Sequence, residues 1–249
     1  MNVPEAFMKQ SLSDMDTAKL LYGSGKYSDA IYHMQQCFEK SLKAIYCYSR
    51  VKFDGKSERE AYDEAVNYRH DTKRSTLDLL RNISSIEEKF LISNLTLDAL
   101  KDPQYQNLTK QLKQATSGFR KKINELASKS EQSKITVVKN FPEIVEKNYQ
   151  KYQSNTLLIK KLVPQTISST NVSIQDLSPL SYSFLFFVSS SCLLYPCLSS
   201  MESVTRYPDY HFKSENISIL NEDNMKGACN KILKMLNDFV EITSMTVKQ

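Results

Sequence analysis

Glycine and proline are scarce in this sequence. Only 5 glycines and 7 prolines occur among 249 residues. The tight turns that join strands favour these two residues together with Asn and Asp. So few of them argue against a sheet-rich fold and predict long helices with few breaks between them.

Cysteines are few and lack a pairing pattern. They are Cys37, Cys47, Cys192, Cys197 and Cys229. Their number is odd, and no two of them form a CxxC motif. Three of them, Cys37, Cys192 and Cys229, fall in apolar helical patterns, where a thiol behaves as a small buried hydrophobe. We therefore expect no disulfide framework and place the protein in a reducing cytoplasm.

The motifs of several enzyme classes are also missing. The chain has 3 histidines, none beside a Cys or Asp cluster, so we expect no metal site. It contains no phosphate-binding or dinucleotide-binding glycine pattern and no G-x-S-x-G, so we expect no cofactor. A basic segment followed by an apolar one is absent from the N-terminal residues, so no signal peptide is expected.

A strong charge imbalance is lacking as well. The chain carries 33 Lys+Arg against 28 Asp+Glu, a formal net charge of +5. A balance this close to neutral gives only a weak reason to expect an acidic partner. It favours a solvated, lysine-rich surface on a globular protein.

Apolar residues at helical spacing are present at both ends of the chain. We expect a first helix over Pro4 to Tyr22, with Pro4 in the first turn. Gly23-Ser24-Gly25 breaks it, and a second helix follows over Tyr27 to Tyr48. The polar stretch Lys52 to Glu60 reads as a loop. A last amphipathic helix is expected over about Glu222 to Ser244.

The most apolar window runs from Leu180 to Met201. Its length is that of a membrane-spanning helix. The window is nevertheless rich in serine and contains Pro196. We therefore predict a helix buried in a bundle and no membrane span.

Three blocks of residues carry a resemblance to a known family. Gln36 to Ala44 follows the pattern Q-x-x-E-K-x-x-K-A, and His70-Asp71 is similar to a G-H-D-L element. Arg69 and Thr72 replace the glycine and leucine of that element. Thr205 to Asp209 contains R-Y-P ahead of the final helix. In this order and spacing, the blocks resemble a prokaryotic branch of the HEPN domain family.

The resemblance implies an all-α fold, an up-and-down antiparallel helical bundle. Residues 1–82 and 178–249 would form this bundle, and residues 83–177 would be a helical insertion or subdomain. It also implies a binding or assembly protein, a homodimer that binds a nucleotide or pairs with a nucleotidyltransferase partner. In such a fold, an apolar strip left on the final helix would be the interface.

Basic and imidazole side chains predict a site within this fold. Lys40 and Lys43 lie on the polar side of the second helix, and two distant loops carry His70 and Arg206. Their convergence would create a groove for a nucleotide phosphate or an RNA backbone. Alternatively, Lys40 pairs with a carboxylate and Arg206 ties its loop to a helix end. Glu39 precedes Lys43 by four residues, the favourable order for an ion pair.

A second hypothesis is catalytic. Arg206 and His211 match the R-x4–6-H motif of HEPN ribonucleases, which act as toxins or in defence. An imidazole can move a proton at the ribose 2′-hydroxyl, and a guanidinium can stabilise charge on the phosphate. Pro208 interrupts the motif and favours a turn over a helix. Whether the protein is an enzyme stays open, and an endoribonuclease is the activity to test.

A third possibility assigns the function to the insertion. A basic face or an ordinary solvated helix face explains its lysines equally well. These lysines are Lys110, Lys113, Lys121 and Lys122.

Overall fold

Helices make up the structure of this protein. The computed structural model describes residues 2–67, 140–154, 190–199 and 223–248, together with positions 79, 110, 114, 117, 118, 121, 124, 125 and 201. Its named helices are α1 (Val3–Gly23), α2 (Tyr27–Asp54), α3 (Glu58–Asn67) and α9 (Asp223–Val247). Residues 140–154 and 190–199 are helical too, and no strand occurs in the described ranges. The predicted all-α class is confirmed.

The first helix begins where its capping residues place it. The Asn2 side chain accepts a hydrogen bond from the Glu5 backbone N–H at 2.9 Å, and the Glu5 carboxylate accepts one from the Asn2 N–H at 3.3 Å. This reciprocal capping box satisfies two otherwise unpaired N–H groups. Pro4 stands in the first turn, as predicted, because its missing N–H costs nothing there.

Glycine marks both ends of α2. Gly25 takes φ +74° in the turn before it, and Gly55 takes φ +65° after it. Residues with a Cβ rarely adopt this left-handed region. At the second end, the Lys56 N–H donates to the Arg50 carbonyl at 3.1 Å and closes the last turn.

The helix α2 is longer than the sequence pattern predicted. It continues past Tyr48 to Asp54, and α3 starts at Glu58. The predicted loop over Lys52 to Glu60 is therefore wrong for all but residues 55–57. A second capping box starts α3, in which the Ser57 N–H donates to Glu60 at 2.9 Å and the Glu60 N–H donates to Ser57 Oγ at 3.3 Å. The Ser-x-x-Glu spacing signals this start.

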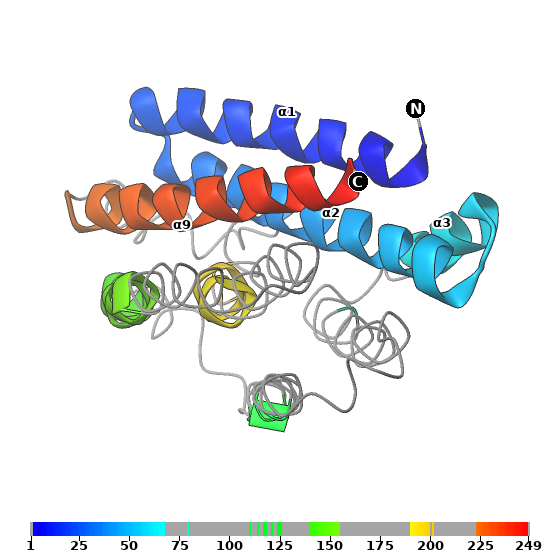
Figure 1. Cartoon of the computed structure of the whole chain (residues 1–249). Coiled ribbons are helices and arrows are strands. Elements are labelled where there is room, and N and C mark those ends of the chain that lie inside the picture. Colours follow the sequence, from blue (N-terminus) through cyan, green and yellow to red (C-terminus); the bar gives the residue numbers. More distant parts are fainter. Residues whose placement is uncertain are drawn as a thin grey trace, which may run out of the picture.

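Three long helices pack into one bundle, in which α1 runs antiparallel to α2 and α9, and α2 and α9 run in the same direction (Figure 1). The helices α1 and α2 make a hairpin, and α9 packs against both, running opposite to α1. One apolar core joins the two ends of the chain. In it the rings of Phe38 and Phe239 lie 5.3 Å apart, and Ile31, Met34 and Leu42 are fully buried. Burial of such side chains is the main stabilising contribution to the fold, roughly 1.5–3 kcal/mol for each.

Two shorter helical stretches cross this bundle. Residues 140–154 and 190–199 are seen nearly end-on beneath α9 and α2 in Figure 1. The first stretch lies in the predicted insertion, yet it packs on the bundle. Glu146 pairs with Lys231 of α9, and the Tyr152 hydroxyl donates to Asp238 of α9. Phe141 and Val145 are fully buried.

The apolar window has the environment predicted for it where it is described. Residues 190–199 are helical, and Leu194 and Leu198 lie in the core. The Gln35 amide of α2 donates to the Leu198 carbonyl at 2.6 Å, which satisfies an acceptor near the end of this stretch. None of the described helices is long and apolar enough to cross a membrane.

All five cysteines are free. Cys37 and Cys229 are buried as predicted, whereas Cys192 is only half-buried. Desolvation is the main cause that raises the pKa of Cys37 to about 12. This thiol therefore stays protonated at neutral pH and serves as a packing residue.

Candidate functional site

The structure describes two of the five predicted site residues. Lys40 and Lys43 lie on α2, whereas His70, Arg206 and His211 fall outside the described residues. The convergence of the two basic loops, and the Arg206–His211 pair, therefore remain predictions. The structure shows the surroundings of the two lysines only.

Lys43 belongs to a closed ion pair. Its ammonium lies 2.7 Å from the Glu39 carboxylate, one turn earlier on α2. Only 8% of the Lys43 side chain is exposed. An ammonium buried this far is stabilised by its paired carboxylate and is poorly placed to meet a ligand. The i,i+4 pairing matches the sequence prediction.

Lys40 belongs to a more open group, here called the Asp14 cluster (Asp14, His33 and Lys40). The Asp14 carboxylate of α1 accepts from Lys40 through one oxygen. Its other oxygen lies 3.0 Å from the Nδ1 atom of His33. Asp14 is 11% exposed, but His33 and Lys40 keep 28% and 26% of their side chains in contact with solvent. The predicted alternative, in which Lys40 pairs with a carboxylate, is confirmed.

The bond to Asp14 sets the hydrogen-bonding character of His33. A carboxylate can only accept, so the Nδ1 atom carries the proton in this contact. In the neutral imidazole, the Nε2 atom is then an acceptor. The ring also meets the Tyr32 ring edge-on, with centroids 5.3 Å apart. The two contacts together restrict how the imidazole can turn.

Gln36 extends the polar edge of α2. It follows His33 by three residues and precedes Lys40 by four, so all three side chains lie along one side of the helix. The Gln36 Nε2 atom is buried and has no hydrogen-bond partner. An unpaired buried donor costs about 1–3 kcal/mol. Such a donor is uncommon in folded proteins.

The sequence contained a signal for the Asp14 cluster that motif reading missed. In a helical hairpin, residues equally distant from the turn face each other. Asp14 stands as far before Gly25 as Gln36 stands after it. A buried hydroxyl pair fixes the same register, since Ser11 Oγ lies 2.7 Å from Ser41 Oγ and donates to the Cys37 carbonyl at 2.9 Å. An acid facing the centre of His33 to Lys40 could have been predicted.

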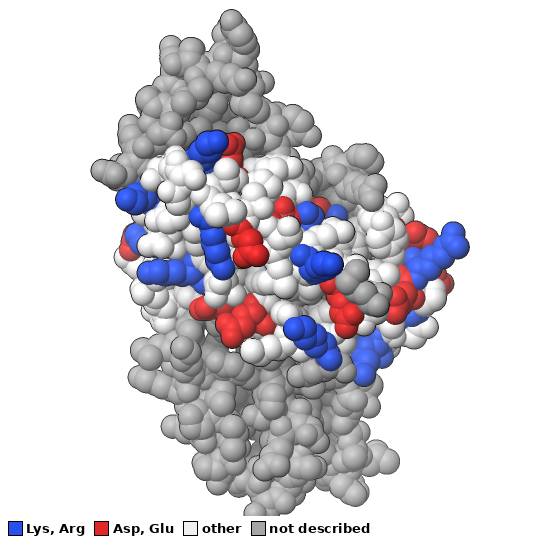
Figure 2. Space-filling model, turned by 90° about the horizontal axis from the view of Figure 1, so that it is seen from above, with Lys and Arg blue, Asp and Glu red and all other residues white. Residues whose placement is uncertain are grey.

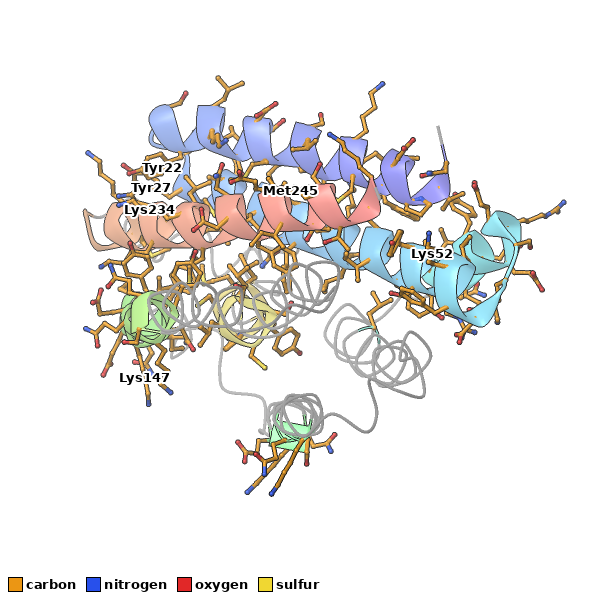
Figure 3. The ribbon with its side chains drawn as sticks, viewed as in Figure 1. Tyr22, Tyr27, Lys52, Lys147, Lys234 and Met245 are labelled. Atoms are coloured by element: carbon orange, nitrogen blue, oxygen red, sulfur yellow. The ribbon has the colours of Figure 1, made fainter. Side chains whose placement is uncertain are left out.

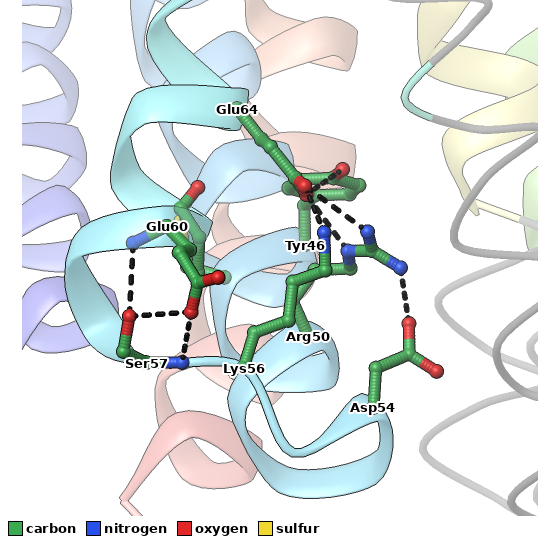
Figure 4. Close-up of polar contacts among 9 residues, drawn as sticks. Tyr46, Arg50, Asp54, Lys56, Ser57, Glu60 and Glu64 are labelled. Atoms are coloured by element: carbon green, nitrogen blue, oxygen red, sulfur yellow. Dashed lines mark hydrogen bonds and ion pairs between the residues drawn. The ribbon is translucent and has the colours of Figure 1, made fainter.

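A second carboxylate centre lies at the other end of α2, here called the Glu64 cluster (Tyr46, Arg50, Lys56 and Glu64; Figure 4). Glu64 of α3 accepts from Arg50 Nε and the Tyr46 hydroxyl, both at 2.9 Å, and from Lys56. The hydrogen bonds from Arg50 are the largest cause that lowers the pKa of Glu64 to about 2. Arg50 also pairs with Asp54. This cluster joins the last turns of α2 to α3.

The surface around these clusters carries charges of both signs. In the view of Figure 2, lysines and arginines alternate with aspartates and glutamates over the described residues. The exposed lysines Lys52, Lys147 and Lys234 come from three different helices, and Lys52 lies at the opposite end of the bundle from the other two (Figure 3). The described face of Figure 2 therefore has no single-sign basic patch of the kind that binds a nucleic-acid backbone.

The exposed side of α9 differs from the predicted apolar strip. Lys226, Asn230, Lys234 and Glu241 are exposed along it. Met245, 56% exposed, is the one large apolar side chain on this side of the described helix (Figure 3). The apolar residues of α9 face the core instead.

No metal-binding group was found among the residues that the structure describes. Within them, no three His, Cys, Asp or Glu side chains lie close enough together to hold an ion.

Comparisons with known proteins agree with this architecture. Residues 4–101 match the HEPN domain family model. A protein of Methanocaldococcus jannaschii named "Putative toxin MJ1304" is 26% identical over 140 residues, which cover 54% of this chain and 85% of the relative. No solved structure matches the chain significantly. The resemblance to the HEPN domain family is thus confirmed for residues 4–101, the part of the chain that matches that family's model.

Proposed function

We propose that this protein is a HEPN-type binding and assembly module that dimerises and holds a nucleotide. The observation that carries the proposal is the Asp14 cluster, which is half-open to solvent on a surface of mixed charge. A partly buried set of donors and acceptors suits a small polar ligand. An extended RNA backbone would call for a broader basic surface.

The oligomeric state and ligand binding test this proposal together. Size-exclusion chromatography with light scattering should give twice the chain mass of 28.7 kDa. Calorimetric titration of the same sample with adenosine 5′-monophosphate should give saturable binding. A monomer that binds no nucleotide at millimolar concentration would refute the proposal.

Pairing with a second protein is part of the same proposal. The relative from Methanocaldococcus jannaschii is named as a putative toxin, which supports pairing with a second protein. The partner we propose is a nucleotidyltransferase. We also propose that residues 1–82 and 178–249 form the bundle and that 83–177 are an insertion docked on it. The contacts of residues 140–154 with α9 support the docking. The cytoplasmic location inferred from the cysteines remains a prediction.

A metal-independent ribonuclease is the second candidate, favoured by the name of the same relative and by the Arg206–His211 spacing. Purified protein would then cleave RNA at neutral pH with EDTA present, and His211→Ala would abolish cleavage. The binding proposal expects intact RNA and nucleotide binding unchanged by His211→Ala. Expression without growth arrest, together with intact RNA, would eliminate the ribonuclease.

A further inference from the structure

The side chains of the Asp14 cluster offer a ligand both hydrogen-bond donors and an acceptor. When the imidazole of His33 is neutral, its Nε2 atom is an acceptor, because Nδ1 then donates to Asp14. Lys40 uses one N–H group on Asp14 and keeps two donors, whereas the unpaired Gln36 Nε2 atom is buried beneath this edge and does not reach solvent. This edge of α2 therefore presents one acceptor, from the neutral imidazole, beside the donors of Lys40.

That pattern complements a hydroxyl group next to an anion. A hydroxyl can donate to an imidazole nitrogen, whereas phosphate oxygens accept from ammonium and amide groups. Both His33 and Lys40 are bonded to the same carboxylate. Given ordinary hydrogen-bond lengths, this keeps the outer Nε2 atom of His33 and the Nζ atom of Lys40 roughly 5–7 Å apart. A sugar hydroxyl and the phosphate beside it span a similar distance.

We propose that His33 and Lys40 bind a ribose phosphate on the α1–α2 edge, with His33 accepting from a ribose hydroxyl and Lys40 donating to a phosphate oxygen. Asp14 is the positioning residue that holds the imidazole and the ammonium. The inference rests on the nucleotide binding proposed above, and it places that ligand away from Arg206 and His211 in the sequence. It requires only residues that the structure describes.

Lys43 explains why the site ends at Lys40. It continues the same side of α2, but its ammonium is paired with Glu39 and its side chain is 8% exposed. A ligand phosphate would have to displace that carboxylate in a buried setting. The site therefore contains one lysine of the Q-x-x-E-K-x-x-K-A motif and not both.

The test uses ribose 5-phosphate, because the proposal involves no base. The full chain has 3 histidines, so a histidine-selective nitrogen–proton NMR spectrum can follow each ring. Phenylalanine substitutions of His70 and His211 assign the signals. Ribose 5-phosphate should shift the His33 signals and leave the other two in place. Inorganic phosphate should shift them far less.

Calorimetry with matched variants gives the affinities. Lys40→Met should weaken ribose 5-phosphate binding at least ten-fold, and Gln36→Met, at a buried amide nitrogen, less than two-fold. Lys40→Arg, which keeps the Asp14 pair, should stay within three-fold. Lys9→Met removes the same charge from an exposed position of α1 and should change the affinity less than two-fold. Circular dichroism checks that each variant is folded.

Each contrary result has a distinct meaning. If ribose 5-phosphate shifts His70 or His211 and not His33, this site is wrong while nucleotide binding stands. If inorganic phosphate shifts His33 as strongly as ribose 5-phosphate does, ribose recognition is overturned. If no ligand binds at millimolar concentration, both the site and the nucleotide part of the proposed function fail. The light-scattering mass still decides dimerisation on its own.

Discussion

The two carboxylate centres of α2 have similar components and differ in completeness. In the Glu64 cluster, one carboxylate accepts from a guanidinium, an ammonium and a phenol, and the guanidinium also holds Asp54. In the Asp14 cluster, a neutral imidazole keeps one nitrogen as an acceptor, and the neighbouring Gln36 Nε2 atom is buried without a partner. A cluster whose donors and acceptors are all hydrogen-bonded holds two helices together. A cluster that keeps an unbonded donor or acceptor can also bind a ligand.

The largest effect should come from removing the filled centre. Glu64→Ala leaves Arg50, whose side chain is 21% exposed, without its main partner. Hydrogen bonds to charged groups contribute more than neutral ones, so we expect a loss of about 2 kcal/mol in the free energy of unfolding. Urea denaturation measures it. Asp63→Ala on the same helix is the control and should cost under about 0.5 kcal/mol, since that pair is exposed at 4.0 Å. Equal losses would contradict the role of the cluster.

Acid should remove the contribution of the filled centre. Its folded-state pKa of about 2 lies below the ordinary value of 4.5. The carboxylate therefore stabilises the fold above pH 4.5, and this stabilisation is lost as the pH falls from 4.5 through 2. The stability gap between the wild type and Glu64→Gln should be constant from pH 7 to 5 and should narrow below pH 4.5. A gap that widens on acidification would reverse the sign and contradict the hydrogen-bonding arrangement.

Removing the open centre should cost less. Asp14→Ala releases His33 and Lys40, which both reach solvent and can be hydrated there. We expect about 1 kcal/mol by urea denaturation, half the loss for Glu64→Ala. Ribose 5-phosphate binding should fall at the same time. A stability loss larger than that of Glu64→Ala would mean that the Asp14 cluster contributes more to holding its helices together than the Glu64 cluster does.

The smallest effect should be a gain. Gln36→Met replaces a side chain whose amide nitrogen is buried and unpaired by an apolar side chain of similar length. Removing an unsatisfied donor should stabilise the fold by about 0.5 kcal/mol and leave ribose 5-phosphate binding within two-fold. Thermal and urea unfolding measure the first change, and calorimetry measures the second. A clear loss of stability would show that the amide has a structural role, and the contrast with the Glu64 cluster would disappear.

Sequence reasoning was most successful where local rules decide the structure. The first helix, its proline in the first turn and the break at Gly23-Ser24-Gly25 depend on neighbouring residues. It failed at the end of α2, because Arg50 and Asp54 are held by ion pairs that the apolar pattern does not record. It also missed the Ser57–Glu60 capping box, although the spacing was visible.

The candidate site depended on contacts between helices. Lys43 and Glu39 are one turn apart, so their pairing followed from the sequence. The partner of Lys40 lies 26 residues away on α1. Without the register of the hairpin, neither Asp14 nor His33 stood out as a site residue. The predicted groove from His70 and Arg206 depends on loops outside the described residues.

The sequence by itself determined that this chain is helical, where its terminal helices lie and that it carries a HEPN motif, because periodicity, capping and motif spacing act within a few turns. The tertiary structure decided which charged side chains are fully paired between helices and which keep part of their surface open to solvent. That distinction arises only when helices pack, since burial and distance fix whether a carboxylate has all its partners. The same kind of acid joins two helices at Glu64, and at Asp14 it holds two partly exposed side chains that we propose bind a ligand.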